Sequence, residues 1–307
     1  MQLKIVEKEQ MEVASLVSVS EYITIVRGII DRGGPEVSEY EILKEFAKVV
    51  SKSSLKDQLV AFELMKPLLV QDSMLGFTFQ KPHGYAGDFE LINRIYIKWK
   101  SDNLQFYKWD ILYHALEATE AVRNRVDYFK GLARLTAKKH DSALVLNLGS
   151  GPCIDLFGYL RTERSHKLKF ECLDMDQKAI DFGTVVCDNY LDDIKFIKKN
   201  ALKFDPGYQY DLIWSAGLFD YFNDKIFTRL LRRVYAMLKP SGELVIGNFS
   251  TYNPSREIME LLGQWYLYHR SKETLFKLAV KAGIPKHLIE VEQEDMGINL
   301  FLHLRKI

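Results

Sequence analysis

The sequence has little cysteine: three occur in 307 residues, and no two are spaced as Cys-x-x-Cys. It therefore offers no zinc knuckle and no thioredoxin-type pair, so we expect no metal site and three reduced, buried thiols at Cys153, Cys172 and Cys187. A run of about 18 uncharged apolar residues, which a membrane helix needs, is also missing. Acidic residues interrupt the first 13 positions, where a signal peptide needs an apolar run. These absences predict a soluble, cytoplasmic protein.

An excess of charge of either sign is absent as well. Lys and Arg number 42 against 41 for Asp and Glu, a formal net charge of +1. General nucleic-acid binders need many phosphate-neutralising cations, so we expect no nucleic-acid partner, while a local basic pocket stays open. Aromatic residues make up 12%, which suits either an apolar ligand pocket or a large aromatic core. We expect a small molecule as the partner, and the oligomeric state stays open, a homodimer included.

The chain shows two regimes of hydrophobic patterning. Up to about Lys139 the spacing is helical, as between Ile42 and Phe46, and glycine and proline breakers divide the stretch into several helices without strands. Beyond that point, short apolar runs alternate with amphipathic stretches, which is typical of a parallel sheet covered by helices. We therefore predict an all-helical N-terminal cap domain at residues 1–120 and an α/β domain at residues 121–307.

Seven of the apolar runs are strand candidates. Each of the first four is followed by a turn and then helical or irregular sequence. We expect the first five to be parallel, and the last two are close enough to form an antiparallel hairpin at one sheet edge. In chain order they are Ala143–Leu148, Lys169–Leu173, Ile194–Ile197, Leu212–Ser215, Leu244–Phe249, His287–Val291 and Ile298–Leu304.

The end of the first strand carries the clearest local signal, Gly149-Ser150-Gly151, followed directly by proline. Glycines after a buried strand leave room for a ligand against the backbone, at the place where open α/β sheets bind ligands. The third glycine of a dinucleotide fingerprint is missing because position 154 is Ile, and no Walker A pattern occurs. By itself this loop is also consistent with a simple turn.

Polar and small residues at the next strand ends strengthen the ligand interpretation. Asp174, with Met175 beside it, lies about 20 residues beyond the glycines, where a carboxylate accepts hydrogen bonds from ribose hydroxyls. Asp176 is the alternative, or else the cap of the following helix. Two further strand ends fit a nucleoside that crosses the sheet: Asn200 and Ala201 suit an adenine edge, and Ser215, Ala216 and Gly217 leave space for a ligand.

These four pieces in this order, over about residues 121–307, resemble class I S-adenosylmethionine-dependent methyltransferases. The resemblance implies a Rossmann-like, seven-stranded sheet with its last strand antiparallel, and S-adenosylmethionine as cofactor. Three further sequence segments indicate a narrower family within this class. Lys81-Pro82-His83-Gly84-Tyr85-Ala86-Gly87-Asp88-Phe89-Glu90, Ser215–Tyr221, and Asn253–Arg256 with Trp265–Arg270 are similar to the bacterial 3-hydroxy fatty acid methyl ester synthases. That similarity implies a methyl ester as product.

The loop of residues 81–90 lies before the predicted sheet and carries Lys81, His83, Tyr85 and Asp88 around two glycines. We interpret it as a lid over the methionine end of the cofactor, with Tyr85 and Asp88 as cofactor contacts. The alternative is a helix connection in which Asp88 caps the helix that follows.

The methyl acceptor determines which catalytic groups are needed. A carboxylate is ionised at neutral pH and needs no base, only a cationic or hydrogen-bonding clamp, whereas a phenol needs a base such as His83. We expect the carboxylate of an apolar, fatty or 3-hydroxy fatty acid, with Lys81, His83, Tyr85 and Arg270 in the catalytic set. Arg270 would be the clamp, although lone arginines are usually solvated.

Three other functions stay open from the sequence. They are a phenol or amine methyltransferase of secondary metabolism, a cofactor-binding sensor or partner subunit without catalysis, and a nucleic-acid methyltransferase. The last is disfavoured because the fourth strand exits through Ser215-Ala216-Gly217-Leu218 rather than the Asn/Asp-Pro-Pro-aromatic motif that grips a flipped base.

Overall fold

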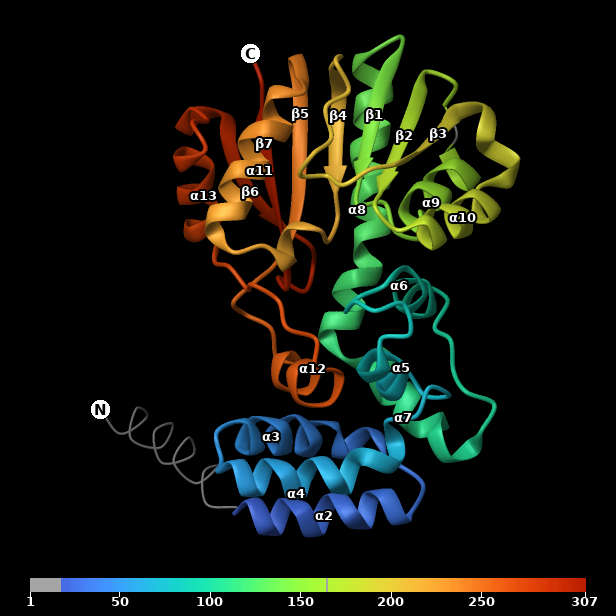
Figure 1. Cartoon of the computed structure of the whole chain (residues 1–307), viewed down its shortest axis with the longest axis vertical. Coiled ribbons are helices and arrows are strands. Elements are labelled where there is room, and N and C mark those ends of the chain that lie inside the picture. Colours follow the sequence, from blue (N-terminus) through green and yellow to red (C-terminus); the bar gives the residue numbers. More distant parts are fainter. Residues whose placement is uncertain (1–17, 164) are drawn as a thin grey trace. The chain divides into compact units, whose positions relative to one another are not determined.

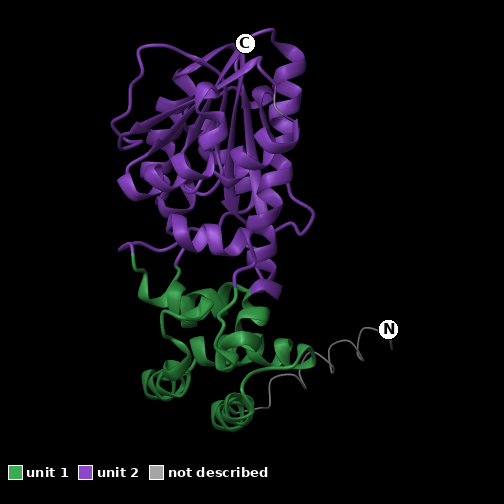
Figure 2. Ribbon diagram, turned by 90° about the vertical axis from the view of Figure 1, so that its right-hand side faces the viewer, with its two compact units in different colours: residues 1–82, 100–113, 255–265 green, residues 83–99, 114–254, 266–307 purple. Residues whose placement is uncertain are grey.

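The computed structural model describes residues 18–163 and 165–307, so the N-terminal stretch in which we expect no signal peptide lies outside the described residues. The described chain divides into two compact units (Figure 2). The helical unit comprises residues up to 82, 100–113 and 255–265, and the sheet unit comprises residues 83–99, 114–254 and 266–307. These units do not follow a single division at residue 120, because the chain passes repeatedly from one unit to the other.

The helical unit contains no strand among its described residues, as the sequence predicts. Serine side chains cap three of its helices, Ser18 before α2, Ser54 before α4 and Ser73 before α5. Helix α12, which follows the fifth strand in sequence, packs on α3 and α5 of the same unit. The helices are α2 (Val19–Asp31), α3 (Tyr40–Ser51), α4 (Leu55–Met65), α5 (Met74–Gln80), α7 (Leu104–Ala115, whose last two residues belong to the sheet unit) and α12 (Arg256–Gly263).

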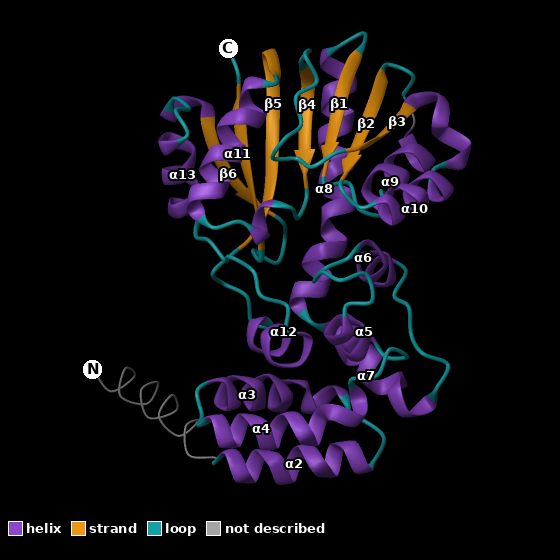
Figure 3. Ribbon diagram, viewed as in Figure 1, coloured by secondary structure: helices purple, strands orange, loops and turns teal. Residues whose placement is uncertain are grey.

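The sheet unit contains a seven-stranded mixed sheet (Figures 1 and 3). Its strand order is β3-β2-β1-β4-β5-β7-β6, and the first five strands in the chain are parallel while β7 is antiparallel to both neighbours. The predicted fold class is confirmed. The strands are β1 (Ala143–Leu148), β2 (Leu168–Asp174), β3 (Ile194–Lys198), β4 (Tyr210–Ser215), β5 (Leu238–Phe249), β6 (Ile289–Gln293) and β7 (Asn299–Arg305).

Three strands begin two or more residues away from their predicted starts, and one of them is β4, which begins two residues earlier, at Tyr210. Strand β5 begins six residues earlier, because Leu238 already pairs with Tyr210 before a register shift brings Glu243 opposite Leu212. A proline and a glycine in this stretch indicate a turn in the sequence, and a bulge accommodates them within the strand. Strand β6 begins two residues later, since the turn of 3-10 helix Lys286–Leu288 precedes it.

Helices bury both faces of the sheet. Residues of α11 and α13 pack with β4, β5 and β7 in one apolar layer, and residues of α8 and α9 pack with β1, β2 and β4 in the other. The three free thiols are buried, as expected, and lie in the second layer. None of the described helices has the length and apolar character to cross a membrane. The helices of this unit are α6 (Phe89–Tyr96), α8 (Glu117–Lys139), α9 (Ile154–Glu163), α10 (Gln177–Val186), α11 (Asp224–Ala236) and α13 (Lys272–Lys281).

Candidate functional site

The predicted ligand residues gather at the carboxyl end of the parallel strands. Strands β2, β1 and β4 are neighbours in the sheet, so the segments that follow Leu148, Asp174 and Ser215 leave the same edge. The chain order reverses between β1 and β4, and such a switch point opens a crevice where open α/β sheets bind ligands. The sheet therefore brings together the residues that the sequence analysis proposed from four separate stretches.

The glycine loop after β1 is held against β2. The backbone N–H groups of Gly149 and Ser150 donate to the carbonyl oxygen of Leu173 at 2.8 and 3.1 Å. Gly151 has a φ of +50°, and a Cβ added there would meet no atom within 4 Å. Ser150 is only 6% exposed, and its hydroxyl is buried without a hydrogen-bond partner in the described chain. The loop thus leaves open space beside a buried polar atom.

Asp174 links β2 to the glycine loop. Its Oδ2 accepts a hydrogen bond from the N–H of Gly151 at 2.9 Å, and its Oδ1 accepts one from the N–H of Asp176 at 3.0 Å. Burial raises the pKa of Asp174 above its ordinary value, while these backbone hydrogen bonds oppose the rise. Each carboxylate oxygen keeps acceptor capacity for a ligand hydroxyl.

Asp176 has the capping role that was its alternative. Its Oδ1 accepts from the N–H of Lys178 at the start of α10, at 2.9 Å, and its Oδ2 accepts from the hydroxyl of Tyr85 at 2.9 Å. Met175, between the two aspartates, is 67% exposed at the strand tip. The loop of residues 83–88 is thereby tied to the end of β2.

The residues at the ends of β3 and β4 differ in how much of their polar groups the protein itself uses. Ser215 is fully buried, and its hydroxyl donates to the carbonyl of Leu148 at 2.8 Å, so its side chain joins β4 to β1. The Oδ1 of Asn200 accepts from the N–H of Leu202 in a local turn, which leaves its NH₂ group available. Ala201, Ala216 and Gly217 add no polar side chain.

The start of α6 organises the rest of the predicted lid. Asp88 caps this helix by accepting from the N–H of Leu91 at 2.9 Å, is 1% exposed, and has its pKa raised by burial. The Nε2 of His83 lies 2.9 Å from Oε2 of Glu90, and the imidazole packs on the ring of Phe89 with centroids 4.5 Å apart. The structure therefore shows the capping role of Asp88, and a cofactor contact by Asp88 stays a prediction.

Two members of the predicted catalytic set, Lys81 and Arg270, direct their charged groups to acceptors of the protein itself. Lys81 belongs to the helical unit, where it ends α5 with a φ of +47° and its Nζ lies 3.3 Å from the carbonyl of Phe79. Burial lowers the pKa of this lysine. Arg270 is 3% exposed, and the structure corrects its expected role as a clamp, because all of its donors meet protein acceptors. These are Oδ1 of Asp224 and of Asn248, and the carbonyls of Phe219, Phe222 and Tyr268.

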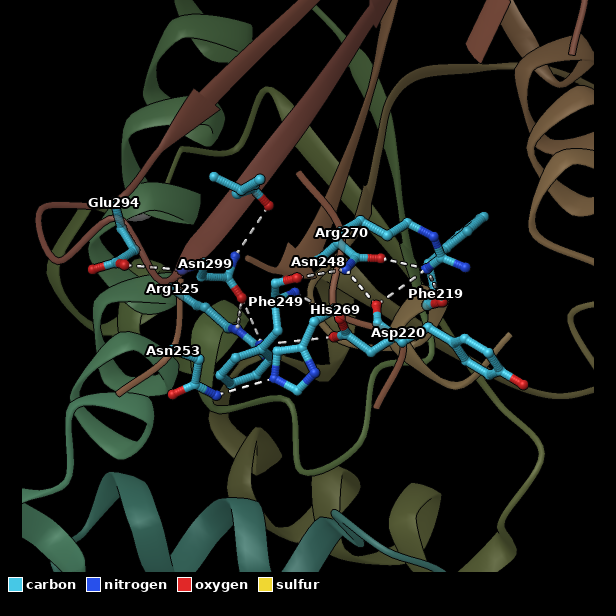
Figure 4. A network of polar contacts seen from close by, with 12 residues as sticks. Arg125, Phe219, Asp220, Asn248, Phe249, Asn253, His269, Arg270, Glu294 and Asn299 are labelled. Atoms are coloured by element: carbon cyan, nitrogen blue, oxygen red, sulfur yellow. Dashed lines mark hydrogen bonds and ion pairs between the residues drawn. The ribbon is translucent and has the colours of Figure 1, made fainter. Parts of the chain in front are cut away.

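A polar cluster beyond the ends of β4 and β5 contains residues that the sequence analysis missed (Figure 4). Arg125 of α8 donates through Nε and Nη2 to Oδ1 of Asn299, at 2.9 and 2.6 Å. Asp220 is 1% exposed, accepts from the N–H of Phe249 at 2.7 Å, and has its pKa raised to about 6 by burial against the opposing effect of Arg125. Asp220 lies in the segment Ser215–Tyr221 but had no role assigned to it. No local sequence pattern marks Arg125 and Asn299, which 174 positions separate.

Comparison with known proteins identifies the kind of domain to which these strands belong. Residues 145–242, from β1 to the start of β5, match the family model described as a methyltransferase domain. This segment is a methyltransferase domain. This match and the order of the sheet agree with the S-adenosylmethionine-dependent class that the sequence analysis predicts. A sequence comparison with curated proteins finds no match.

Solved structures share the fold of the methyltransferase domain and of more of the chain. A "possible exported protein" from Bordetella parapertussis is 19% identical, with a TM-score of 0.60 over 94% of this chain and 95% of that one. An O-methyltransferase family protein from Burkholderia thailandensis is 16% identical, with a TM-score of 0.50 over 83% and 74%. Magnesium protoporphyrin IX methyltransferase from Synechocystis PCC 6803 is 11% identical, with a TM-score of 0.51 over 71% and 94%.

The residues of the methyltransferase domain fit S-adenosylmethionine. A nucleoside needs a carboxylate for its ribose hydroxyls and backbone space for its bulk, and Asp174 and Gly151 provide them. The buried hydroxyl of Ser150, without a partner in the described part of the chain, is a group that a polar ligand would satisfy. We therefore predict that these three residues hold the cofactor, with Asn200 at the adenine end.

We expect cofactor binding to slow hydrogen exchange in residues 83–90. Tyr85 is 39% exposed and already bonded to Asp176, two residues beyond the predicted ribose site, so a bound cofactor would bring this loop and the strand tip together. Exchange mass spectrometry with and without saturating S-adenosylmethionine measures the change.

Two controls belong to this experiment. Tyr85→Phe removes the hydrogen bond to Asp176 and should speed exchange in the free protein, while residues 205–209 precede β4, at the opposite end of the strand, and should not respond to the cofactor. Equal exchange in residues 83–90 with and without cofactor would mean that this segment is only a connection.

Proposed function

We propose that this methyltransferase methylates the carboxylate of a small apolar acid. When bound, S-adenosylmethionine supplies an activated methyl group that forms a bond to the acceptor oxygen as the carbon–sulfur bond breaks, and S-adenosylhomocysteine is left. An ionised carboxylate carries the lone pair and has no proton to lose, so the chain only has to hold and orient the acid. The resemblance to 3-hydroxy fatty acid methyl ester synthases supports a fatty or 3-hydroxy fatty acid within this class.

The observation that carries the proposal is the hydrogen bonding of two histidines in the sheet unit, His83 and His269. His83 directs Nε2 to Glu90, and its Nδ1 is buried. His269 has Nδ1 3.2 Å from the carbonyl of Leu267 and Nε2 3.1 Å from Nδ2 of Asn253. Both nitrogens of His269 are in polar contact, and the one unbonded nitrogen, Nδ1 of His83, is buried in the described chain, so neither ring exposes a free nitrogen to an acceptor hydroxyl. An acceptor that needs no base therefore suits this arrangement better than a phenol.

Methyl transfer to an acid should be nearly independent of pH between about pH 6 and 9, because the acceptor is ionised throughout that range. The assay incubates the full-length chain with S-adenosylmethionine and panels of linear acids, 3-hydroxy acids, phenols and amines. Mass spectrometry identifies methylated products, and single-turnover rates are then measured across pH for the acceptor that reacts fastest. We expect a methyl ester and a flat profile.

His83→Gln is the matched variant, since glutamine keeps a hydrogen bond to Glu90 but cannot titrate. For an acid we expect its single-turnover rate to stay within about threefold of wild type. A phenol that relies on His83 would instead react faster as the pH rises through the ordinary histidine pKa of about 6.5, and the variant would lose about 100-fold in rate. A phenolic product with that pH-dependent rise, absent in the variant, would overturn the proposal.

A further inference from the structure

Arg125 lies at the exits of the two central strands. It projects from α8, its guanidinium carbon is 5.3 Å from the ring centre of Phe249 at the end of β5, and its side chain is 6% exposed. On the other side it meets Gly217 just beyond β4, where an added Cβ would lie 2.7 Å from Nη1. Figure 4 shows the side chain within the polar cluster of this edge.

The hydrogen bonds of Arg125 leave one side of its guanidinium open. Nε and Nη2 share a single neutral acceptor, Oδ1 of Asn299. The carboxylate of Asp220 is 3.9 Å from Nη2, beyond hydrogen-bond distance, and its Oδ1 is engaged by the N–H of Phe249. Within residues 18–163 and 165–307, Nη1 has no hydrogen bond.

Arg270 provides the contrast within the same cluster. It lies 2.9 Å from Asp224, and every one of its donor groups is used, as an arginine with a purely structural role requires. The guanidinium of Arg125 has a neutral amide as its hydrogen-bond acceptor, and the carboxylate of Asp220, 3.9 Å away, compensates its charge without accepting a hydrogen bond, so Nη1 keeps free donors. An anion that reaches Nη1 would form a charge-assisted hydrogen bond there.

Asn299 fixes where this charge lies. It is the first residue of β7 and pairs with Phe249, so the carboxyl end of β5 and the start of β7 set its position together. The β6–β7 turn is held by Glu294, which is 4% exposed and accepts from the N–H groups of Ile298 and Asn299 through Oε1. A rigid turn therefore places the amide that orients the guanidinium.

We propose that Arg125 binds the carboxylate of the methyl acceptor through Nη1, beside the exit of β4, and that Asn299 is its positioning residue. The inference rests on the proposed function, since it assigns the clamp that an acid substrate needs. It transfers to Arg125 the role that the sequence analysis gave to Arg270. Because Gly217 has no side chain, the guanidinium can approach the backbone just beyond β4.

The test uses the full chain and the acid that the wild-type enzyme methylates fastest in the acceptor panel. We expect Arg125→Gln to raise KM for that acid by at least about 30-fold, because a buried hydrogen-bonded charge pair is lost. The Kd for S-adenosylmethionine, measured by calorimetry, should stay within about threefold. The KM of Arg125→Lys for the acid should lie between those of the wild type and Arg125→Gln, since lysine keeps the charge but not the paired donors of the guanidinium.

Three further variants separate this role from a structural one. Arg161→Gln removes a surface arginine of the same unit and should change neither constant. Asn299→Ala should raise KM with less effect than Arg125→Gln. Gly217→Ala keeps the arginine but places a methyl group 2.7 Å from Nη1 and should raise KM for the acid, which keeps the test valid if Arg125→Gln does not fold.

The outcomes distinguish the two proposals. If the wild-type enzyme methylates no acid and only phenols or amines, the proposed function fails and the clamp with it. If the wild-type enzyme methylates an acid but Arg125→Gln and Gly217→Ala keep its KM within threefold, the proposed function stands and the assignment of Arg125 is overturned.

Discussion

Replacing Asp174 by alanine is expected to weaken the binding of S-adenosylmethionine by about 30-fold or more, roughly 2 kcal/mol. The carboxylate would accept hydrogen bonds from the ribose, and bonds to an ionised acceptor are about twice as strong as neutral ones. It also receives the N–H groups of Gly151 and Asp176, so its loss releases the glycine loop from the strand tip. Both effects weaken the binding of S-adenosylmethionine.

Calorimetry on the wild type and three variants measures this prediction. Asp174→Asn keeps one acceptor oxygen and should lose less than Asp174→Ala. Asp176→Ala removes the cap of α10, worth about 1 kcal/mol of stability, and the bond to Tyr85, but should keep most of the affinity. Unchanged affinity in Asp174→Ala together with a large loss in Asp176→Ala would move the ribose contact to Asp176.

Gly247→Ala should destabilise the sheet unit and weaken cofactor binding together. A Cβ on Gly247 would lie 2.2 Å from the carbonyl oxygen of Ala216, and this neighbour is backbone that no rotamer change can move away. Overpacking of this kind costs about 1–3 kcal/mol, occasionally more. The strand exit that carries Ala216 and Gly217 must shift, and it borders the predicted cofactor site.

Thermal melting and calorimetry test this prediction. We expect Tm to fall by about 2–12 °C, given about 1–3 kcal/mol and about 2–4 °C per kcal/mol for a unit of this size. Gly131→Ala is the matched control: the glycine lies inside α8, an added Cβ meets nothing within 4 Å, and the change should stabilise by about 0.5–1 kcal/mol. A variant at position 247 as stable as the wild type would show that the exit of β4 adjusts freely.

The local pattern of apolar, glycine and aspartate residues was enough to predict most of the sheet and the strand ends at which we place the cofactor. The apolar run Ala143–Leu148 coincides with β1, and the other strands begin and end within two residues of their predictions, except that β5 begins six residues earlier. Strand ends are local features, since a buried apolar run followed by glycine or aspartate is typical of the point where a parallel strand leaves its sheet. For the same reason Asp174 and the glycine loop could be assigned to one edge before the structure placed them there.

Only the tertiary structure decided the roles of the charged side chains. The sequence shows two arginines, Arg125 within a long helix and Arg270 after an aromatic segment, and nothing local distinguishes them. The fold surrounds Arg270 with acceptors, whereas Arg125 has one hydrogen-bond acceptor, a neutral amide from a strand 174 residues away, and the Asp220 carboxylate at 3.9 Å. The sequence by itself determined the class of fold and predicted where the cofactor binds, because both depend on patterns within single elements. The acceptor side depends on which distant groups share a low-dielectric environment, and folding alone sets those distances.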